Sequence, residues 1–430
     1  MEKKIISKLP YKGCTDWYPE DIYIRNYIFD IWSRVAKKFG YEEYDTPLIE
    51  DANLYKAKSG DELGGNQLYS FVDKGEREIA LRPEMTPSLA RIVANRKNEL
   101  NFPLRWFNIG RYYRYEKPQK GRKREFFQLN IDILGISEIY AEVEIIQYVL
   151  EVMKEFKAPA NTYELRINSR YLIEYLFDNI LEIEGDIRPK LARALDNFTK
   201  IPINDFKEYL KELSLTDDQI VKVLDYLEWD IQSLEKIESK SKGAKELIEL
   251  FKNLETLSIS NVKFAPYIVR GLAYYTGIVI ELFDIGEGKN PRALFGGGRY
   301  DDLLEIFGEN KLPAFGLGWG DITTLDYLKS YNLLPEFKND IQIFLPLMEE
   351  NLRTDVNKLA IFLRENGIKT LEQLVPQKLS NQIKYADKKN IPWVAIIGDE
   401  EKEKGLIQLK DMNNRESFLI KKEDIIQKIL

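Results

Sequence analysis

Residues 105–135 carry the side chains with the clearest chemical potential. Arg114 and Glu116 stand two positions apart, so that in a strand their side chains share a face. Further on, polar and apolar residues alternate, which places Gln128 and Asp132 on one face of a second strand. A guanidinium, two carboxylates and an amide can therefore converge on one side of a rigid sheet.

The segment between these two predicted strands is strongly basic. Residues 117–124 include five cations among eight residues, together with Pro118 and Gly121, a pattern typical of a long antiparallel hairpin with a basic tip. Such a loop suits phosphate. Charge runs are also common as exposed surface, and the tip alone leaves both interpretations open.

A second group of candidates ends a strand predicted at residues 76–86. Arg82, Glu84 and Thr86 stand at the end of this strand, and strand ends are a usual place for binding groups. An exposed ion pair between Arg82 and Glu84 is the simpler interpretation of these two residues taken alone, because surface pairs of this kind are common and carry little information.

The composition removes several kinds of chemistry. The chain has no histidine, so no mechanism can use imidazole as a base, nucleophile or metal ligand. Its single cysteine, Cys14, excludes an internal disulfide and a cysteine zinc cluster, in keeping with a reducing compartment. Carboxylates, Arg, Lys, Tyr, the substrate itself or a hard cation bound by oxygen remain as candidates. The net charge of −7 argues against a uniformly basic surface but not against a local basic patch.

Size and patterning predict two or three domains in a soluble, cytoplasmic protein. With 430 residues the chain exceeds one ordinary domain, and an apolar content of 44% suffices for a core. The N-terminus has no sustained apolar segment, and no run approaches the roughly 18 apolar residues of a membrane span. We therefore expect no membrane association.

The periodic segments separate several regions. A helix that ends at Gly40 and a strand at residues 41–50 open the chain. Residues 171–258 are helical in pattern, with a capping box at Thr216, and predict an inserted helical domain. Alternating strands and helices over residues 340–430 predict a compact α/β domain.

Glycines gather in two segments between these domains. Three are consecutive at residues 296–298, which indicates backbone brought close to a ligand or to another strand. Gly316, Gly318 and Gly320 alternate, as suits a strand that lies flat under a planar group. A tight turn remains the simpler interpretation of the spacing alone.

These motifs resemble those of the histidyl-tRNA synthetases, a family of class II aminoacyl-tRNA synthetases. The hairpin resembles motif 2 of that class, and the first helix with Pro47 resembles motif 1. The segments RGLAYYTG, residues 270–277, and GGGRYDDL, residues 296–303, resemble the two signatures peculiar to the histidine enzymes. The resemblance covers nearly the whole chain.

The resemblance implies an α+β fold. It implies a class II catalytic domain with an antiparallel sheet at residues 1–170 and 259–331, a helical insertion domain at residues 171–258, and an α/β anticodon-binding domain at residues 340–430. The implied reaction joins L-histidine and ATP, accompanied by Mg²⁺, into histidyl-adenylate and transfers the histidyl group to the 3′-terminal adenosine of tRNA(His). An obligate homodimer through motif 1 is also implied.

Roles toward ATP follow from the resemblance position by position. Arg114 is expected to bridge the α-phosphate and the substrate carboxylate, and Arg270 to reach the α-phosphate from the opposite side, so these two are the expected catalytic residues. Glu116 is expected to accept from the adenine amino group, Arg122 to hold the outer phosphates, and Phe126 to stack on the purine. Arginine suits such a site because its planar fork can hold a carboxylate and a phosphate together.

The implied histidine site uses a second set of side chains, with Arg114 on the carboxylate. These are Glu84, Thr86 and Gln128 around the α-amino group, Asp132 and Tyr275 at the two imidazole nitrogens, and Tyr274 beside them. Discrimination then depends on buried acceptors that a wrong side chain leaves unpaired, an asymmetry of about 10⁴-fold when fully used.

Three positions depart from the family pattern, and one of them is Phe127, which stands where histidine is frequent in the family. Asp132 stands where the best-known members have glutamate, and Thr323 stands at the position aligned with the arginine of motif 3, which grips the γ-phosphate. We expect either that Arg122 and the basic tip take over more of the phosphate charge or that activation is weakened.

The main alternative is a catalytically inactive paralogue that senses histidine, similar to the regulatory subunit of ATP phosphoribosyltransferase. Such a protein keeps the histidine pocket and loses the ATP arginines and the tRNA domain. Arg114, Arg122 and Arg270 are present here, and residues 341–430 resemble the anticodon domain, which favours the enzyme. A nucleic-acid-binding module without activation chemistry is a further alternative that tolerates Thr323.

Overall fold

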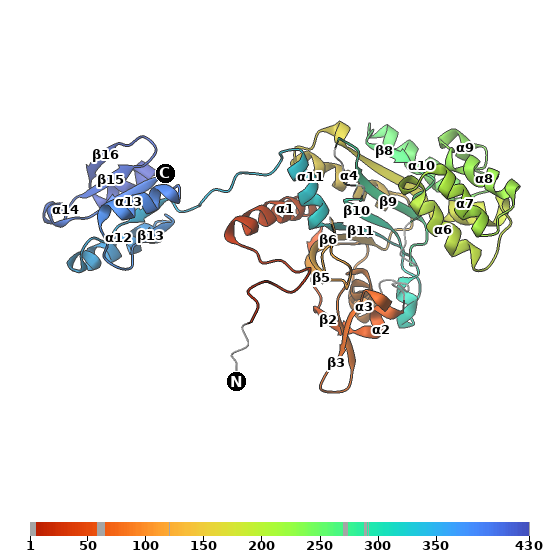
Figure 1. The fold of residues 1–430 in the computed structure, drawn as a ribbon, viewed down its shortest axis with the longest axis horizontal. Coiled ribbons are helices and arrows are strands. Elements are labelled where there is room, and N and C mark those ends of the chain that lie inside the picture. Colours follow the sequence, from red (N-terminus) through yellow and green to blue (C-terminus); the bar gives the residue numbers. More distant parts are fainter. Residues whose placement is uncertain are drawn as a thin grey trace. The chain divides into compact units, whose positions relative to one another are not determined.

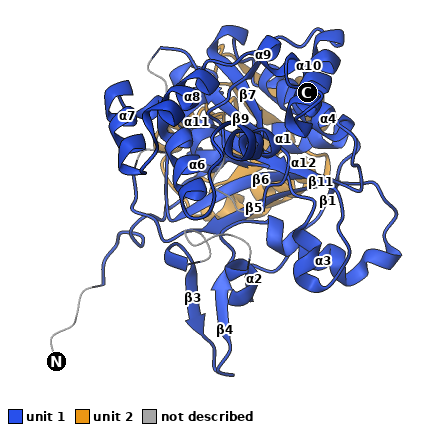
Figure 2. Cartoon of the chain, turned by 90° about the vertical axis from the view of Figure 1, so that its right-hand side faces the viewer, with its two compact units in different colours: residues 1–335 blue, residues 336–430 orange. Residues whose placement is uncertain are grey.

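A computed structural model describes residues 6–57, 65–119, 121–269, 274–287, 290 and 292–429. The chain divides into two compact units, residues 1–335 and residues 336–430, which Figure 2 shows in different colours. Each unit is built on its own central sheet. Within the described residues, no helix combines the length and the apolar composition needed to cross a bilayer.

An eight-stranded, mostly antiparallel sheet forms the centre of the first unit (Figure 1). Its strand order is β1-β5-β6-β11-β10-β9-β7-β8, and the pairs at the two ends, β1 with β5 and β7 with β8, are parallel. The strands are β1 (Glu42–Glu43), β5 (Leu104–Tyr113), β6 (Glu125–Leu134), β7 (Tyr163–Ser169), β8 (Val262–Phe264), β9 (Ile278–Asp284), β10 (Phe295–Arg299) and β11 (Ala314–Gly320). Because β6 pairs with β11, the hairpin lies beside the glycine-rich strands.

The predicted hairpin consists of β5 and β6, which pair antiparallel along their whole length. The alternation along β6 is also as predicted. Leu129 and Ile131 belong to the main hydrophobic core, whereas Asn130 and Asp132 point to the other face of the sheet. Both faces are buried, since Asp132 is only 3% exposed.

One detail of the hairpin differs from the prediction. Strand β5 ends at Tyr113, so Arg114 and Glu116 follow the strand instead of continuing it. The amide N–H of Glu116 donates to the carbonyl of Arg114 at 2.8 Å, which bends the chain away from the ladder. Gly121, at the tip, has a φ of +77°, a conformation that glycine adopts without steric cost.

Two long helices contribute to the apolar face of the sheet. Helix α1 (Pro19–Lys38) begins with a proline, whose fixed φ suits the first helical position, and α4 (Tyr140–Glu155) packs against it. Trp32 of α1 lies against Trp319 of β11, with ring centroids 6.1 Å apart. The hydroxyl of Tyr148 in α4 donates to the carbonyl of Trp32 at 3.1 Å.

A small antiparallel sheet and two helices adjoin the hairpin (Figure 1). They are β2 (Ile49–Asp51), β4 (Glu78–Leu81) and β3 (Tyr69–Val72), with α2 (Ala52–Lys56) and α3 (Thr86–Arg96). Two strand predictions need correction here. The strand expected at residues 41–50 is divided between the two sheets, because Pro47 lacks the N–H that a ladder requires. The strand expected at residues 76–86 is shorter, since Thr86 and Pro87 already open α3.

The region after β7 is helical, as its sequence predicts, and its helices gather at one end of the sheet (Figure 1). Its α-helices are α5 (Arg170–Tyr175), α6 (Ile187–Asn197), α7 (Ile203–Glu212), α8 (Asp217–Leu227), α9 (Ile231–Glu235) and α10 (Lys242–Thr256). The predicted capping box is present: Thr216 accepts from the amide of Gln219, and the Gln219 side chain accepts from the amide of Thr216. Helix α11 (Asp321–Ser330) follows β11.

The second unit is a five-stranded mixed sheet with helices, in agreement with the predicted α/β pattern. Its order is β13-β12-β14-β15-β16, with β13, β12 and β14 parallel and the other two antiparallel. The elements are β12 (Ile343–Leu345), α12 (Arg353–Glu365), β13 (Thr370–Glu372), α13 (Leu379–Lys388), β14 (Trp393–Ile396), α14 (Asp399–Lys404), β15 (Ile407–Asp411), β16 (Ser417–Ile420) and α15 (Lys422–Ile429). Ile343 and Phe344 enter separate apolar clusters, so both faces of this sheet are covered.

Candidate active site

A cavity of about 1050 Å³ lies on the polar face of the central sheet. Its walls come from the basic tip, from strands β6 and β9 to β11, and from the segment that leads into α3. Nine predicted site residues line it, namely Glu84, Thr86, Arg114, Glu116, Arg122, Phe126, Gln128, Tyr274 and Tyr275. Of the remaining two, Asp132 is buried and is not among the residues that line the cavity, and Arg270 lies outside the described residues.

Arg114 is held from two sides. Its Nε donates to the carbonyl of Pro83 at 3.0 Å, and its guanidinium carbon lies 5.1 Å from the centre of the Phe126 ring. Burial lowers the pKa of this guanidinium, and the carboxylates of Glu84 and Glu116 oppose that effect. The η nitrogens are not hydrogen-bonded to any described residue, so the planar group is oriented and still able to donate to an anion.

Glu84 is the buried acceptor of the site. The hydroxyl of Tyr274 donates to its Oε2 at 2.7 Å, and Thr86 is the next polar neighbour of that hydroxyl, at 3.5 Å. Burial and the Glu84 carboxylate raise the pKa of Tyr274 well above its ordinary value, so the hydroxyl remains protonated and donates. The other oxygen of Glu84 is buried without a hydrogen-bond partner among the described residues. An unsatisfied carboxylate oxygen of this kind suits a bound ammonium group.

Asp132 is hydrogen-bonded to Tyr300, a residue of the cavity that was not predicted from the sequence. The hydroxyl of Tyr300, which lines the cavity, donates to Oδ1 of Asp132 at 2.5 Å. Burial raises the pKa of Asp132 to about 7, although this hydrogen bond acts in the opposite direction. The signal for Tyr300 was present in the segment GGGRYDDL, where it directly follows Arg299.

The alternating glycines of β11 make room for side chains of β6. A Cβ at Gly318 would lie 2.5 Å from Nε2 of Gln128, and a Cβ at Gly316 would collide with the carboxylate of Asp132. Ala314–Gly320 therefore form a strand, and not the tight turn that the glycine spacing alone favoured. The groups that lie across the glycines are the side chains of the neighbouring strand.

At the tip, Glu116 and Arg122 form an ion pair of 2.9 Å across the turn. The Glu116 side chain is 8% exposed, whereas that of Arg122 is 43% exposed. Phe126 packs on Tyr112 with ring centroids 5.9 Å apart, which leaves it in the wall of the cavity. The basic tip is therefore part of the cavity and not only exposed surface.

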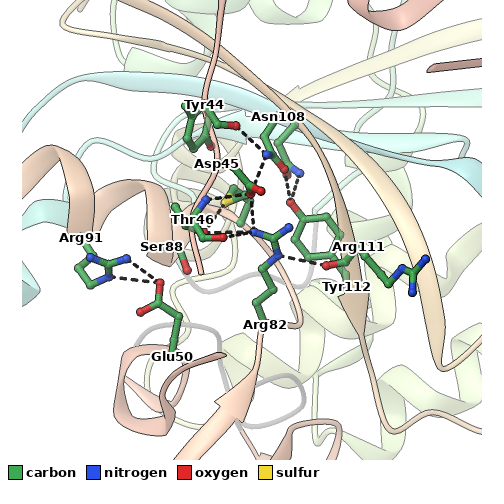
Figure 3. Close-up of polar contacts among 12 residues, drawn as sticks. Tyr44, Asp45, Thr46, Glu50, Arg82, Ser88, Arg91, Asn108, Arg111 and Tyr112 are labelled. Carbon is green, nitrogen blue, oxygen red and sulfur yellow. Dashed lines mark hydrogen bonds and ion pairs between the residues drawn. The ribbon is translucent and has the colours of Figure 1, made fainter. Parts of the chain in front are cut away.

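The expectation of an exposed ion pair between Arg82 and Glu84 is wrong. It is only 4% exposed, and its guanidinium donates to Asp45 at 2.8 Å, to the carbonyl of Thr46 at 2.8 Å and to the carbonyl of Arg111 at 3.1 Å (Figure 3). Its partner is thus Asp45 and not Glu84. Local alternation could not reveal this, because the partners lie about thirty to forty residues away in the sequence.

The same network continues into the hairpin. Asn108 donates to the carbonyl of Tyr44 at 2.7 Å and accepts from the hydroxyl of Tyr112 at 3.0 Å (Figure 3). Asn130 of β6 then donates to that hydroxyl at 2.8 Å. A chain of buried polar contacts therefore connects the segment before β2 to the polar face of β6, and fixes Glu84 relative to the hairpin through Arg82.

Strand β6 is also tied to the start of α11. Oδ1 of Asp321, a residue only 5% exposed, accepts from the amide of Phe127 at 3.0 Å. Burial raises the pKa of Asp321 to about 7. The hydroxyl of Thr323 donates to the carbonyl of Leu294 at 3.0 Å, so this side chain connects α11 to the segment before β10.

An antiparallel sheet with such a cavity, joined to a separate α/β unit, is the architecture of a class II aminoacyl-tRNA synthetase. Comparison with known families agrees. The family described as histidyl-tRNA synthetase matches residues 13–320, and the anticodon binding domain matches residues 342–430. The chain belongs to the histidyl-tRNA synthetase family.

Individual relatives cover the same extent. A histidine–tRNA ligase of Leptospira biflexa is 38% identical over 433 residues, which span 100% of this chain and 99% of the relative. A chloroplastic/mitochondrial histidine–tRNA ligase of Arabidopsis thaliana is 36% identical, over 98% of this chain and 87% of the relative. The crystal structure of histidyl-tRNA synthetase from Nostoc superposes with a TM-score of 0.80 at 24% identity, over 99% of each chain, and shares the fold. The predictions of fold class and family are confirmed.

Proposed function

We propose that the chain is a histidine–tRNA ligase that activates L-histidine with ATP and then transfers it to the 3′-terminal adenosine of tRNA(His). One observation carries the proposal: a carboxylate oxygen of Glu84 that is buried without a hydrogen-bond partner among the described residues shares its cavity with the η nitrogens of Arg114, which are hydrogen-bonded to none of these residues either. The two groups suit the α-amino and carboxylate groups of one amino acid. The anticodon binding domain matched at residues 342–430 favours the enzyme over a histidine-sensing paralogue.

In the first step an oxygen of the histidine carboxylate attacks the α-phosphorus, and the bond to pyrophosphate breaks. The protein must hold two anions together and offset the charge on phosphorus. Arg114 serves both anions because its fork is oriented by Pro83 and Phe126. We assign Arg270 to the opposite side of the phosphate from the family resemblance.

Residues of the hairpin bind the adenosine end of ATP. Phe126 offers its ring to the purine, and Glu116 accepts from the adenine amino group. Arg122 pairs with Glu116 across the turn and extends toward the outer phosphates. Mg²⁺ would enter the cavity with ATP, as part of that substrate, and would be bound chiefly through phosphate oxygens and water, which is the usual form of its binding.

Histidine occupies the opposite end of the cavity. Glu84, Thr86 and Gln128 bind the α-amino group, and Tyr275 and Asp132 recognise the imidazole. Tyr274 holds Glu84 in place by its hydrogen bond of 2.7 Å. Because Asp132 accepts from Tyr300, that hydroxyl also belongs to the imidazole end of the cavity.

The remaining parts of the proposal concern the whole enzyme. Residues 1–170 and 259–331 form the catalytic domain, residues 171–258 the helical insertion domain, and residues 340–430 the anticodon-binding domain. Two copies of the chain associate as a homodimer through motif 1. The single cysteine suits the reducing environment of the cytoplasm, where we place the enzyme.

The test is isotope exchange between pyrophosphate and ATP. We expect exchange when histidine is added and none with other amino acids. A protein that binds histidine without exchange would instead be the sensor. The Arg114→Ala variant should lose exchange while it retains its folded far-UV CD spectrum, and normal exchange in that variant would contradict the role of Arg114.

A further inference from the structure

A second arginine lies at the tip end of the cavity, and none of the roles above uses it. Arg292 belongs to the segment before β10 and lines the cavity together with Arg122. It lies directly over the turn of the hairpin, since a Cβ at Gly121 would stand 3.0 Å from Cδ of Arg292. The tip therefore meets a cation from a distant part of the chain.

Among the residues that the structure describes, Arg292 has no carboxylate partner of its own. Arg122 pairs with Glu116 at 2.9 Å, but the guanidinium of Arg292 makes no hydrogen bond or ion pair with any described residue. Burial and the nearby charge of Arg122 both lower the pKa of Arg292, and only Glu116 opposes them. A guanidinium nevertheless stays charged at neutral pH. Two half-buried guanidinium groups thus have one carboxylate between them, and the remaining positive charge favours binding of an anion.

The backbone that carries Arg292 is held in place. Oδ1 of Asn290 accepts from the amide of Arg292 at 3.1 Å, and Nδ2 of the same side chain donates to Asp326 of α11 at 3.3 Å. A second connection runs from the Thr323 hydroxyl to the carbonyl of Leu294 at 3.0 Å. Both contacts join the segment to α11, so the arginine is positioned before any ligand arrives.

Helix α11 itself supplies no cation to this end of the cavity. Among its residues, Asp321–Ser330, the one basic side chain is Lys329 in the last turn, which lines a small side cavity and not the main one. Thr323 does line the main cavity, but its hydroxyl is engaged with Leu294. The segment before β10 therefore provides the charge that α11 lacks.

We propose that Arg292 binds the β- and γ-phosphates of ATP together with Arg122, and that Thr323 and Asn290 position the segment from which it extends. This inference rests on the proposed function, because it names the ligand of that same cavity. Two guanidinium groups from different segments can hold a triphosphate in a bent form, with its α-phosphate left at Arg114.

The experiment compares Arg292→Gln and Arg292→Lys with the unaltered protein, and Lys329→Gln is the matched control for removal of a nearby cation. Equilibrium binding of ATP and of AMP is measured, because AMP lacks the two outer phosphates. Loss of a charge-assisted contact should weaken ATP binding roughly ten- to a hundredfold in the glutamine variant and leave AMP binding unchanged. The lysine variant should recover part of the affinity, and the control should match the unaltered protein.

Two outcomes would overturn the inference. One is unchanged ATP binding in the glutamine variant, and the other is an equal loss of ATP and AMP binding, which indicates a structural effect. In the first case, a higher KM for tRNA would assign Arg292 to nucleic acid. If the unaltered protein shows no histidine-dependent exchange, the proposed function fails, while the binding comparison still decides the role of Arg292.

Discussion

Replacement of Gly318 by alanine would test how the glycines of β11 serve the proposed histidine site. A Cβ at this position would stand 2.5 Å from Nε2 and 2.8 Å from Cδ of Gln128. Such distances are too short for real atoms, so the carboxamide must leave its place across the strand. Because the obstacle is the end of a flexible side chain, the backbone can stay, and the free energy of unfolding should fall by only about 0.5–1.5 kcal/mol.

The loss of activity should be larger than the loss of stability. Gln128 is proposed to bind the α-amino group, and a hydrogen bond to a charged group contributes about 1.5–3 kcal/mol. The value of kcat/KM for histidine should therefore fall roughly 10- to 150-fold. The KM for ATP should stay unchanged, because the three atoms nearest to the added Cβ all belong to Gln128 and not to the basic tip.

Gly320→Ala is the matched control on the same strand. A Cβ there has Thr323 Oγ1 as its nearest neighbour, at 3.6 Å, which is an ordinary contact. Both variants are assayed by pyrophosphate exchange at varied histidine and varied ATP, with unfolding in urea measured in parallel. Equal kcat/KM for histidine in the two variants would refute the space-making role of Gly318. A parallel rise of both KM values in Gly318→Ala would indicate general distortion instead.

Three further predictions concern the buried network around Arg82, the carboxyl group of Asp321 and the second unit. Arg82→Met should lower the free energy of unfolding by about 1–3 kcal/mol in urea denaturation, because the carbonyls of Thr46 and Arg111 lose a buried donor, and an unchanged midpoint would contradict the network. The pKa of Asp321 is about 7 in the folded protein, so between about pH 4 and 7 the folded state holds a proton that the unfolded state has released, and stability falls as pH rises. Asp321→Asn should reduce this fall, measured as the urea midpoint at both ends of the range, and an identical fall would exclude Asp321 as its source. Removal of residues 336–430 should spare pyrophosphate exchange and impair charging of tRNA, whereas equal charging would argue against the domain assignment.

The hairpin shows how far local patterns reach. The alternation of residues along β6 predicts its two faces, because successive side chains of a strand point to opposite sides whatever the rest of the fold does. The end of β5 was predicted less well. The bend at Arg114 and Glu116 depends on a hydrogen bond between backbone atoms, which the residue types do not predict.

Charged residues show the limit of the same reasoning. Arg82 and Glu84 look like a surface pair by spacing, yet Arg82 is buried against Asp45. Glu84 lines the cavity and has one buried oxygen without a hydrogen-bond partner among the described residues. Arg292 lies in a segment without periodicity, so nothing in its neighbours distinguishes it from an exposed loop residue. Burial of a charge depends on which distant segments pack around it, and sequence spacing holds no record of that.

Sequence patterns were sufficient to predict the hairpin with its basic tip, the inserted helices and the C-terminal α/β pattern, as well as the exclusion of imidazole chemistry and the family resemblance. These depend on periodicity, composition and contiguous motifs, which are local properties. Three contacts required the tertiary structure. The hydroxyl of Tyr300 donates to Asp132, side chains of β6 occupy the space beside the glycines of β11, and Arg292 lies next to the basic tip. Each of these facts is a contact between strands or loops far apart in the chain, fixed by the pairing of the sheet and not by any single segment.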